Sequence, residues 1–187
     1  MTHVGAAQLS SKIAVVDLPS LLFMKHALGI DLFNWPGLCE VLRKKVGSCP
    51  SLSEIFCTIH PEKYKCSKLT PGLLRDLHKT RGITLVPAHS QNESDDRMVK
   101  KLLHVSSCKC QELVLLSTDG DLVEEMCWLG QKKNIHTHLV ATELPDVGSG
   151  NCCLSRDILD RIRRHEISFY DLKHFKPRIQ KIEPAYH

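Results

Sequence analysis

Short apolar runs recur along the chain and are separated by longer amphipathic stretches. The apolar runs are rich in branched side chains and lie at residues 13–16, 55–59, 83–87 and 113–116, and a further strand is predicted over 135–140. Runs this short that lack alternation predict strands covered on both faces, as in a parallel sheet. The apolar spacing within 52–59 also fits a helix. Its β-branched residues and the His60-Pro61 pair that follows favour a strand from Ile55.

The stretches between these runs carry apolar residues at helical spacing. Helices are predicted from Pro19 to Leu28, from Pro36 to Val46, from Pro71 to Arg81, from Asp95 through Leu103, from about 120 through Leu129, and from Ser155 onward. Alternating strands and helices indicate an α/β fold. We expect a three-layer α/β/α sandwich with a central, mostly parallel sheet of about five strands.

The length of 187 residues fits one domain, with a core over about 12–165 and a basic C-terminal arm over about 166–187. The formal net charge of +4 allows a polyanionic partner without requiring one. We find no signal peptide and no long apolar segment, so no membrane partner is expected. Nine cysteines, an odd number, favour an intracellular protein, cytoplasmic or nuclear, with reduced thiols.

Some cysteines and histidines are close enough in sequence to suggest zinc ligands. The two clusters are Cys57-x2-His60-x5-Cys66 and His104-x3-Cys108-x-Cys110. Neither has a paired CxxC or the spacing of a zinc finger. Because free cysteine is a common buried residue, packing in the core explains them better than a structural metal.

Acidic residues stand where the predicted strands give way to helices. Asp17 follows the first strand, Asp95 and Asp96 open a helix, and Asp119 and Asp121 follow the run 113–116. Such aspartates are good helix caps, which is the simplest explanation for any one junction. Carboxyl ends of parallel strands face one crevice, however, and converging carboxylates would repel one another unless a cation lay between them. Oxygen ligands favour Mg²⁺ or Mn²⁺ over zinc.

These segments resemble a known family. The stretches IAVVD, ESDDRMVKKL, LVLLSTDGDLVEEM and GQKKNIHTHLVA are similar to the NYN domain of the PIN-like ribonucleases, which include Regnase-type nucleases and protein-only RNase P enzymes. The likeness spans roughly Lys12 to Ala141. It implies a metal-dependent endoribonuclease that uses Mg²⁺ or Mn²⁺ to hydrolyse single-stranded or looped RNA. It also allows a homodimer, and protein partners that supply specificity.

The resemblance assigns roles to particular positions. Its catalytic and metal-binding residues match Asp17, Asp95, Asp96, Asp119 and Asp121, without deciding which of Asp95 and Asp96 touches the metal. On the substrate side we expect Ser20, Arg97 and Thr118. The family commonly has Asp-Gly-x-Asn after the first strand, whereas this chain has Asp17-Leu18-Pro19-Ser20. The shorter serine puts efficient catalysis in question.

Two other functions stay open. The main alternative is a catalytically weak or inactive module of the same fold that acts in RNA binding or protein–protein interaction. A DNA flap-type nuclease would share the metal chemistry. Recognition of unpaired RNA usually needs aromatic stacking. Trp35, Tyr170 and Phe175 are candidates, although buried packing explains each of them as well.

Overall fold

The computed structural model describes residues 11–49, 52–59, 71–88, 94–143 and 154–181. Its strands are β1 (Lys12–Val16), β2 (Leu52–Ile59), β3 (Thr84–Pro87), β4 (Glu112–Leu116), β5 (His136–Ala141) and β6 (Ser168–Asp171). Its helices are α1 (Leu18–Ala27), α2 (Trp35–Lys44), α4 (Pro71–Lys79), α5 (Asp95–Ser106), α6 (Gly120–Lys133), α7 (Arg156–Arg163), the 3₁₀ turn η1 (Leu172–Phe175) and α8 (Lys176–Ile179).

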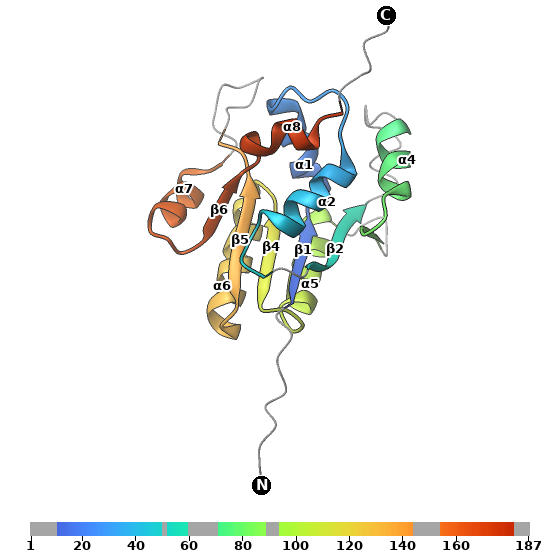
Figure 1. Cartoon of the computed structure of the whole chain (residues 1–187). Helices are drawn as coiled ribbons and strands as arrows, with labels where there is room; N and C mark the ends of the chain where they lie inside the picture. The colour runs from blue at the N-terminus through green and yellow to red at the C-terminus, as the bar shows by residue number, and fades with distance from the viewer. Residues whose placement is uncertain (1–10, 50–51, 60–70, 89–93, 144–153, 182–187) are drawn as a thin grey trace, which may run out of the picture.

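One sheet organises these elements. Its strand order is β3-β2-β1-β4-β5-β6 and every pairing is parallel. Helices α1, α2 and α8 lie in front of the sheet and α5 and α6 lie behind it (Figure 1). The three-layer α/β/α fold predicted from the sequence is therefore confirmed. Strands β1 and β4 are buried along their whole length, which explains their unbroken apolar sequence.

The C-terminal residues differ from the prediction. The expected basic arm contains a sixth strand, β6, which pairs with β5. The chain then returns to the front layer, where the backbone N–H of Asn34 donates to the carbonyl of Ile179 at 2.7 Å. Buried Ile167, Leu172 and Ile179 lie among charged residues that stay exposed. The high charge therefore concealed a strand of only four residues, and 168–181 belong to the fold.

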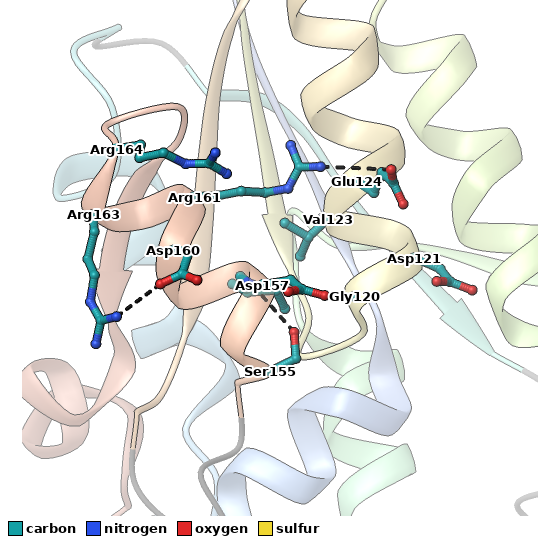
Figure 2. Close-up of a pocket in the computed structure, with 11 residues that line it drawn as sticks. Gly120, Asp121, Val123, Glu124, Ser155, Asp157, Asp160, Arg161, Arg163 and Arg164 are labelled. Carbon is teal, nitrogen blue, oxygen red and sulfur yellow. Dashed lines mark hydrogen bonds and ion pairs between the residues drawn. The ribbon is translucent and has the colours of Figure 1, made fainter.

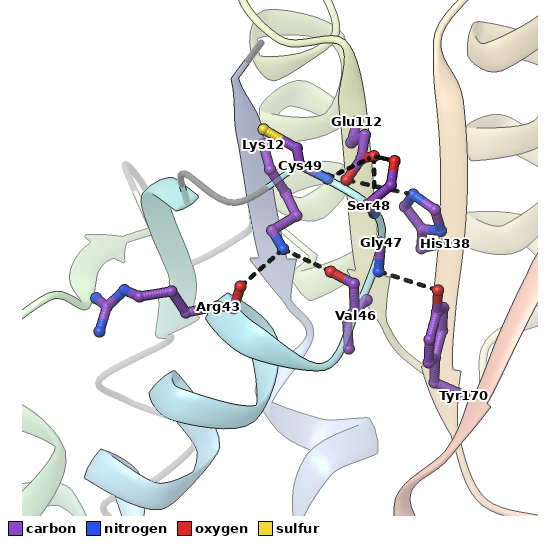
Figure 3. Close-up of polar contacts among 9 residues, drawn as sticks. All are labelled: Lys12, Arg43, Val46, Gly47, Ser48, Cys49, Glu112, His138 and Tyr170. Atoms are coloured by element: carbon purple, nitrogen blue, oxygen red, sulfur yellow. Dashed lines mark hydrogen bonds and ion pairs between the residues drawn. The ribbon is translucent and has the colours of Figure 1, made fainter.

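A buried polar network closes the amino-terminal end of β1 and β4 (Figure 3). Lys12 and Glu112 are register partners across the two strands, and both side chains are buried. The Lys12 ammonium donates to the carbonyls of Arg43 at 3.1 Å and Val46 at 2.5 Å. Burial lowers the pKa of Lys12, while the charge of Glu112 opposes that shift. The network fixes the turn after α2 to the bottom of the sheet.

Glu112 supplies the acceptors of this network. Its Oε1 accepts from the backbone N–H groups of Ser48 and Cys49, both at 2.9 Å, and from the Ser48 hydroxyl. Burial alone would raise the pKa of Glu112, but these donors bring it below its usual value. Gly47 has a φ of +72°, and a Cβ there would lie 2.2 Å from Glu112 Oε2. The turn therefore requires glycine at this position.

We predict that Glu112→Ala destabilises the protein by about 3 to 5 kcal/mol, because three donors lose their acceptor in a buried site and the buried Lys12 ammonium loses the nearby opposite charge. Urea unfolding monitored by circular dichroism would measure the loss. Glu54→Ala, at an exposed position in β2, is the matched control and should change stability by less than about 0.5 kcal/mol. Equal losses in the two variants would contradict the assigned role of the network.

Candidate functional site

The strand order reverses between β1 and β4. From β1 the chain moves outward through β2 and β3, and then returns to place β4 on the other side of β1. In open α/β sheets, ligands bind beyond the carboxyl ends of the strands at such a reversal. Asp17 directly follows β1, and residues 117–119 directly follow β4. The Asp17 backbone N–H donates to the Leu116 carbonyl at 3.0 Å, so the ladder holds the two junctions together.

The Asp17 carboxylate lies inside a cluster of hydroxyl groups. Its side chain is only 3% exposed, and its Oδ2 accepts hydrogen bonds from the Ser20 hydroxyl at 2.5 Å and the Ser117 hydroxyl at 2.8 Å. The Thr118 hydroxyl donates to Ser20 Oγ at 3.3 Å. The first turn of α1 and the end of β4 thus orient a single carboxylate. Ser20 and Thr118, both predicted from the sequence, belong to this cluster.

Like charges surround this carboxylate. Burial raises the pKa of Asp17, the Ser20 and Ser117 hydrogen bonds lower it, and the charges of Asp119 and Asp96 raise it further. The net direction is upward, so the folded protein disfavours the ionised form. Asp96, of the acidic pair, is one of the charges that raise the pKa of Asp17.

Asp119 also caps α6. Its Oδ1 accepts from the backbone N–H groups of Asp121 at 2.8 Å and Leu122 at 3.3 Å, and its own N–H donates to Ser117 Oγ at 3.0 Å. Capping and a role in the site are therefore compatible, because the cap uses one carboxylate oxygen. Among the described residues no hydrogen bond reaches its Oδ2.

The remaining predicted residues lie farther out. Asp95 opens α5 and is half-buried, whereas Asp96 and Arg97 are exposed in the same turn. Asp121 is exposed in the first turn of α6, and its side chain points to the side of that helix away from α7 (Figure 2). The sequence prediction treated Asp121 as an equal member of the cluster. The structure instead attaches its backbone to Asp119 and directs its carboxylate outward.

The oxygen atoms at this site suit a divalent cation that keeps several bound waters better than a cation coordinated entirely by protein side chains. Within the part of the chain that the structure describes, no group of three or more His, Cys, Asp or Glu side chains has the geometry of a metal site. Mg²⁺ characteristically binds one or two carboxylates and keeps several waters. Asp17 and Asp119, with hydroxyl groups beside them, match that habit. Repulsion among the carboxylates is also what a divalent cation would relieve.

Zinc does not fit the described cysteines and histidines. The Cys108 thiol is contacted by the Lys133 ammonium at 2.8 Å, and His104 Nε2 lies 2.8 Å from Glu125 Oε1. Of the other cluster, His60 and Cys66 lie outside the described residues.

Two grooves lie beside α6, one on the side that faces α7 and one on the side that faces α5. The groove toward α7, of about 570 Å³, is lined by acids of both helices and by arginines of α7 and its C-terminal cap (Figure 2). Its arginines are already paired: Arg161 contacts Glu124 and Glu166, and Arg163 contacts Asp160. The groove toward α5, of about 430 Å³, holds an exposed tryptophan, Trp128.

Sequence reasoning missed Trp128. It is 46% exposed, whereas Trp35, a stacking candidate from the sequence, is 1% exposed and packs edge-on against Phe33. Tyr170 accepts the Gly47 N–H with its hydroxyl, which also explains it structurally. The detectable signal was the position of Trp128 on the polar side of α6, opposite buried Met126 and Leu129.

Comparison with known proteins supports the fold and nothing finer. No protein-family model and no curated protein matches the chain. Among solved structures, it is similar to a protein of unknown function from Vibrio parahaemolyticus RIMD 2210633, with a TM-score of 0.59 and 12% sequence identity. The alignment covers 89% of this chain and 94% of that chain. The resemblance to the NYN domain therefore stays a prediction.

The environment of Asp17 predicts how stability depends on pH. A carboxyl whose pKa is raised by folding binds more protons in the folded state, so stability falls as the pH rises from its unfolded value of 3.8 through the folded one. Asp17→Asn removes this loss. We expect the variant to become more stable relative to wild type as the pH rises.

Urea unfolding in EDTA, between about pH 4 and pH 8, would measure this trend. The slope of the stability difference is the readout, because altered hydrogen bonds to Ser20 and Ser117 contribute only a constant offset. Asp31→Asn, at an exposed position, should run parallel to wild type. A flat difference for Asp17→Asn would contradict the assigned burial of the charge.

Proposed function

We propose that this protein is a metal-dependent endoribonuclease that hydrolyses phosphodiester bonds in single-stranded or looped RNA. The observation that carries the proposal is the buried Asp17 carboxylate, joined through Ser117 to Asp119 at the reversal point of a parallel sheet. A ligand there would meet carboxylates that gain from a divalent cation, and such cations in turn bind phosphate oxygens. The resemblance to the NYN domain supplies the substrate class.

Asp17 and Asp119 would hold Mg²⁺ or Mn²⁺, with Asp96 as a third, more distant carboxylate. A bound ion of this kind makes water nucleophilic at neutral pH and offsets negative charge at a phosphodiester. Ser20 and Ser117 fix the orientation of the Asp17 carboxylate, and the α6 cap fixes Asp119. Hydrolysis forms one bond from the water oxygen to phosphorus and breaks one to the leaving ribose oxygen, which gains a proton.

The surroundings of the site suit an RNA backbone. Arg97, exposed beside Asp96, and Thr118 are the groups we assign to the substrate, and Asp121 would orient water or solvated cations at the outer edge. We place the protein in a reducing compartment, cytoplasmic or nuclear, because its nine cysteines are an odd number. No helix in the described ranges is long and apolar enough to cross a bilayer.

One observation favours a second function, a catalytically weak module that binds RNA or protein. The Ser20 hydroxyl donates a hydrogen bond to Asp17 Oδ2. The family that this chain resembles commonly has asparagine at the position of Ser20. The hydroxyls of Ser20 and Ser117 both donate to that oxygen, which leaves it less able to bind a metal ion. The same fold and surface would then serve binding without cleavage.

We predict that Asp119→Asn lowers cleavage of a labelled, unstructured oligoribonucleotide in Mn²⁺ by roughly 100-fold or more. Asparagine caps helices as well as aspartate does, so the variant should stay folded, with stability changed by less than about 0.5 kcal/mol. Asp31→Asn, purified in parallel, should cleave like wild type. Equal rates in all three proteins would assign the activity to a contaminant, and no cleavage by wild type would favour the binding module.

Metal binding can be measured without turnover. We predict that Mn²⁺ raises the melting temperature of wild type by roughly 5 to 10 °C at a concentration 100-fold above its Kd, because the ion binds only the folded state. Asp17→Asn and Asp119→Asn should each lose most of this shift, and Asp31→Asn should keep it. Differential scanning fluorimetry with an EDTA baseline would test this. No shift in wild type would count against a metal at these carboxylates.

A further inference from the structure

An exposed tryptophan lies beside a line of basic side chains on the rear layer of the fold. Trp128, on α6, lines the groove between α5 and α6. Its indole contacts the Lys132 ammonium, 4.3 Å from the ring centroid, and lies 5.9 Å from the His104 ring. These contacts hold the indole at the surface without burying it.

Helix α5 supplies the basic line, which we call the α5 stripe. It consists of Arg97, Lys100, Lys101 and His104, at the i, i+3, i+4, i+7 spacing that places side chains on one helix face. The stripe begins next to Asp96, at the site, and ends about 10 Å farther along the helix, beside Trp128. Within the described ranges, the side chains of Arg97 and Lys100 take part in no ion pair.

We propose that the groove between α5 and α6 binds the unpaired part of the RNA substrate, with a base stacked on Trp128 and phosphates along the α5 stripe. The inference rests on the proposed function for the identity of the polyanion. Single-strand binding surfaces combine these two components, an aromatic face for the bases and cations for the backbone. Because Trp128 lies about two helical turns from the α6 cap, the bound strand would lead to the Asp119 carboxylate.

Three acids line the groove and restrict where phosphates can lie, and of the α5 stripe Lys100 and His104 line it. Asp121, Glu124 and Glu125 all project from α6, whereas the basic groups project from α5. Glu125 is engaged by His104. Phosphates would therefore follow the α5 side, and the neutral base would lie on the α6 side, where stacking does not require charge. In duplex RNA the bases are already stacked on one another, so no base is free to stack on Trp128.

The two tryptophans make a direct test. Trp35 is buried, so fluorescence quenching by a single-stranded oligouridylate of about 12 nucleotides, in EDTA, should report on Trp128 alone. We expect saturable quenching in wild type, no quenching in Trp128→Ala, and about ten-fold weaker binding by that variant in an anisotropy assay. Trp128→Phe should keep most of the affinity. A duplex of equal length should not quench.

Charge is tested separately. Lys100→Ala should lower the slope of log Kd against log salt concentration by about one, because one fewer counterion is released on binding. Lys45→Ala, at an exposed position beside α2, should leave the slope unchanged. Equal affinity of wild type and Trp128→Ala, or no binding by wild type, would overturn the inference. Binding that depends on Trp128 without any cleavage in Mn²⁺ would uphold the inference and refute the nuclease.

Discussion

The hydrogen bond from the Asp17 N–H to the Leu116 carbonyl extends the pairing of β1 and β4 past the last residue of β1. That register brings the Asp17 carboxylate against the Ser117 hydroxyl, and Ser117 in turn accepts the Asp119 N–H. A shift of one residue would turn the side chain toward the other helical layer. The acidic site is therefore a property of strand register, and each apolar contact that fixes the register supports it indirectly.

The same two strands bury charge at both ends, with opposite results. At the amino-terminal end Lys12 faces Glu112, and backbone groups satisfy most of what remains. At the carboxyl-terminal end Asp17 and Asp119 carry the same sign, and among the described residues their hydrogen bonds come from hydroxyl groups and backbone N–H groups. The first end holds charges of opposite sign, and hydrogen bonds from Lys12 and to Glu112 anchor the turn after α2. At the second end no described basic side chain is hydrogen-bonded to Asp17 or Asp119, which is the physical basis for proposing a cation there.

Sequence patterns predicted the central strands because β1 and β4 are buried on both faces and read as unbroken apolar runs. They did not predict β6, whose four residues carry too little apolar pattern to stand out from their basic surroundings. They located Asp17 and Asp119 because strand ends are visible in sequence. They left Asp95 and Asp96 equivalent, whereas the structure half-buries Asp95 and exposes Asp96, and they overlooked Trp128 because exposure is a tertiary property.

The position of β6 has a consequence for how the chain can fold and be shortened. Because β6 covers the outer side of β5, a polypeptide that ended near residue 165 would present β5 as an open edge, ready to pair with other chains. The front layer would also lose the clasp between Asn34 and Ile179. During synthesis this sheet can be completed only after residues 168–171 leave the ribosome. Aggregation of truncated forms would then reflect an unfinished sheet rather than an unstable core.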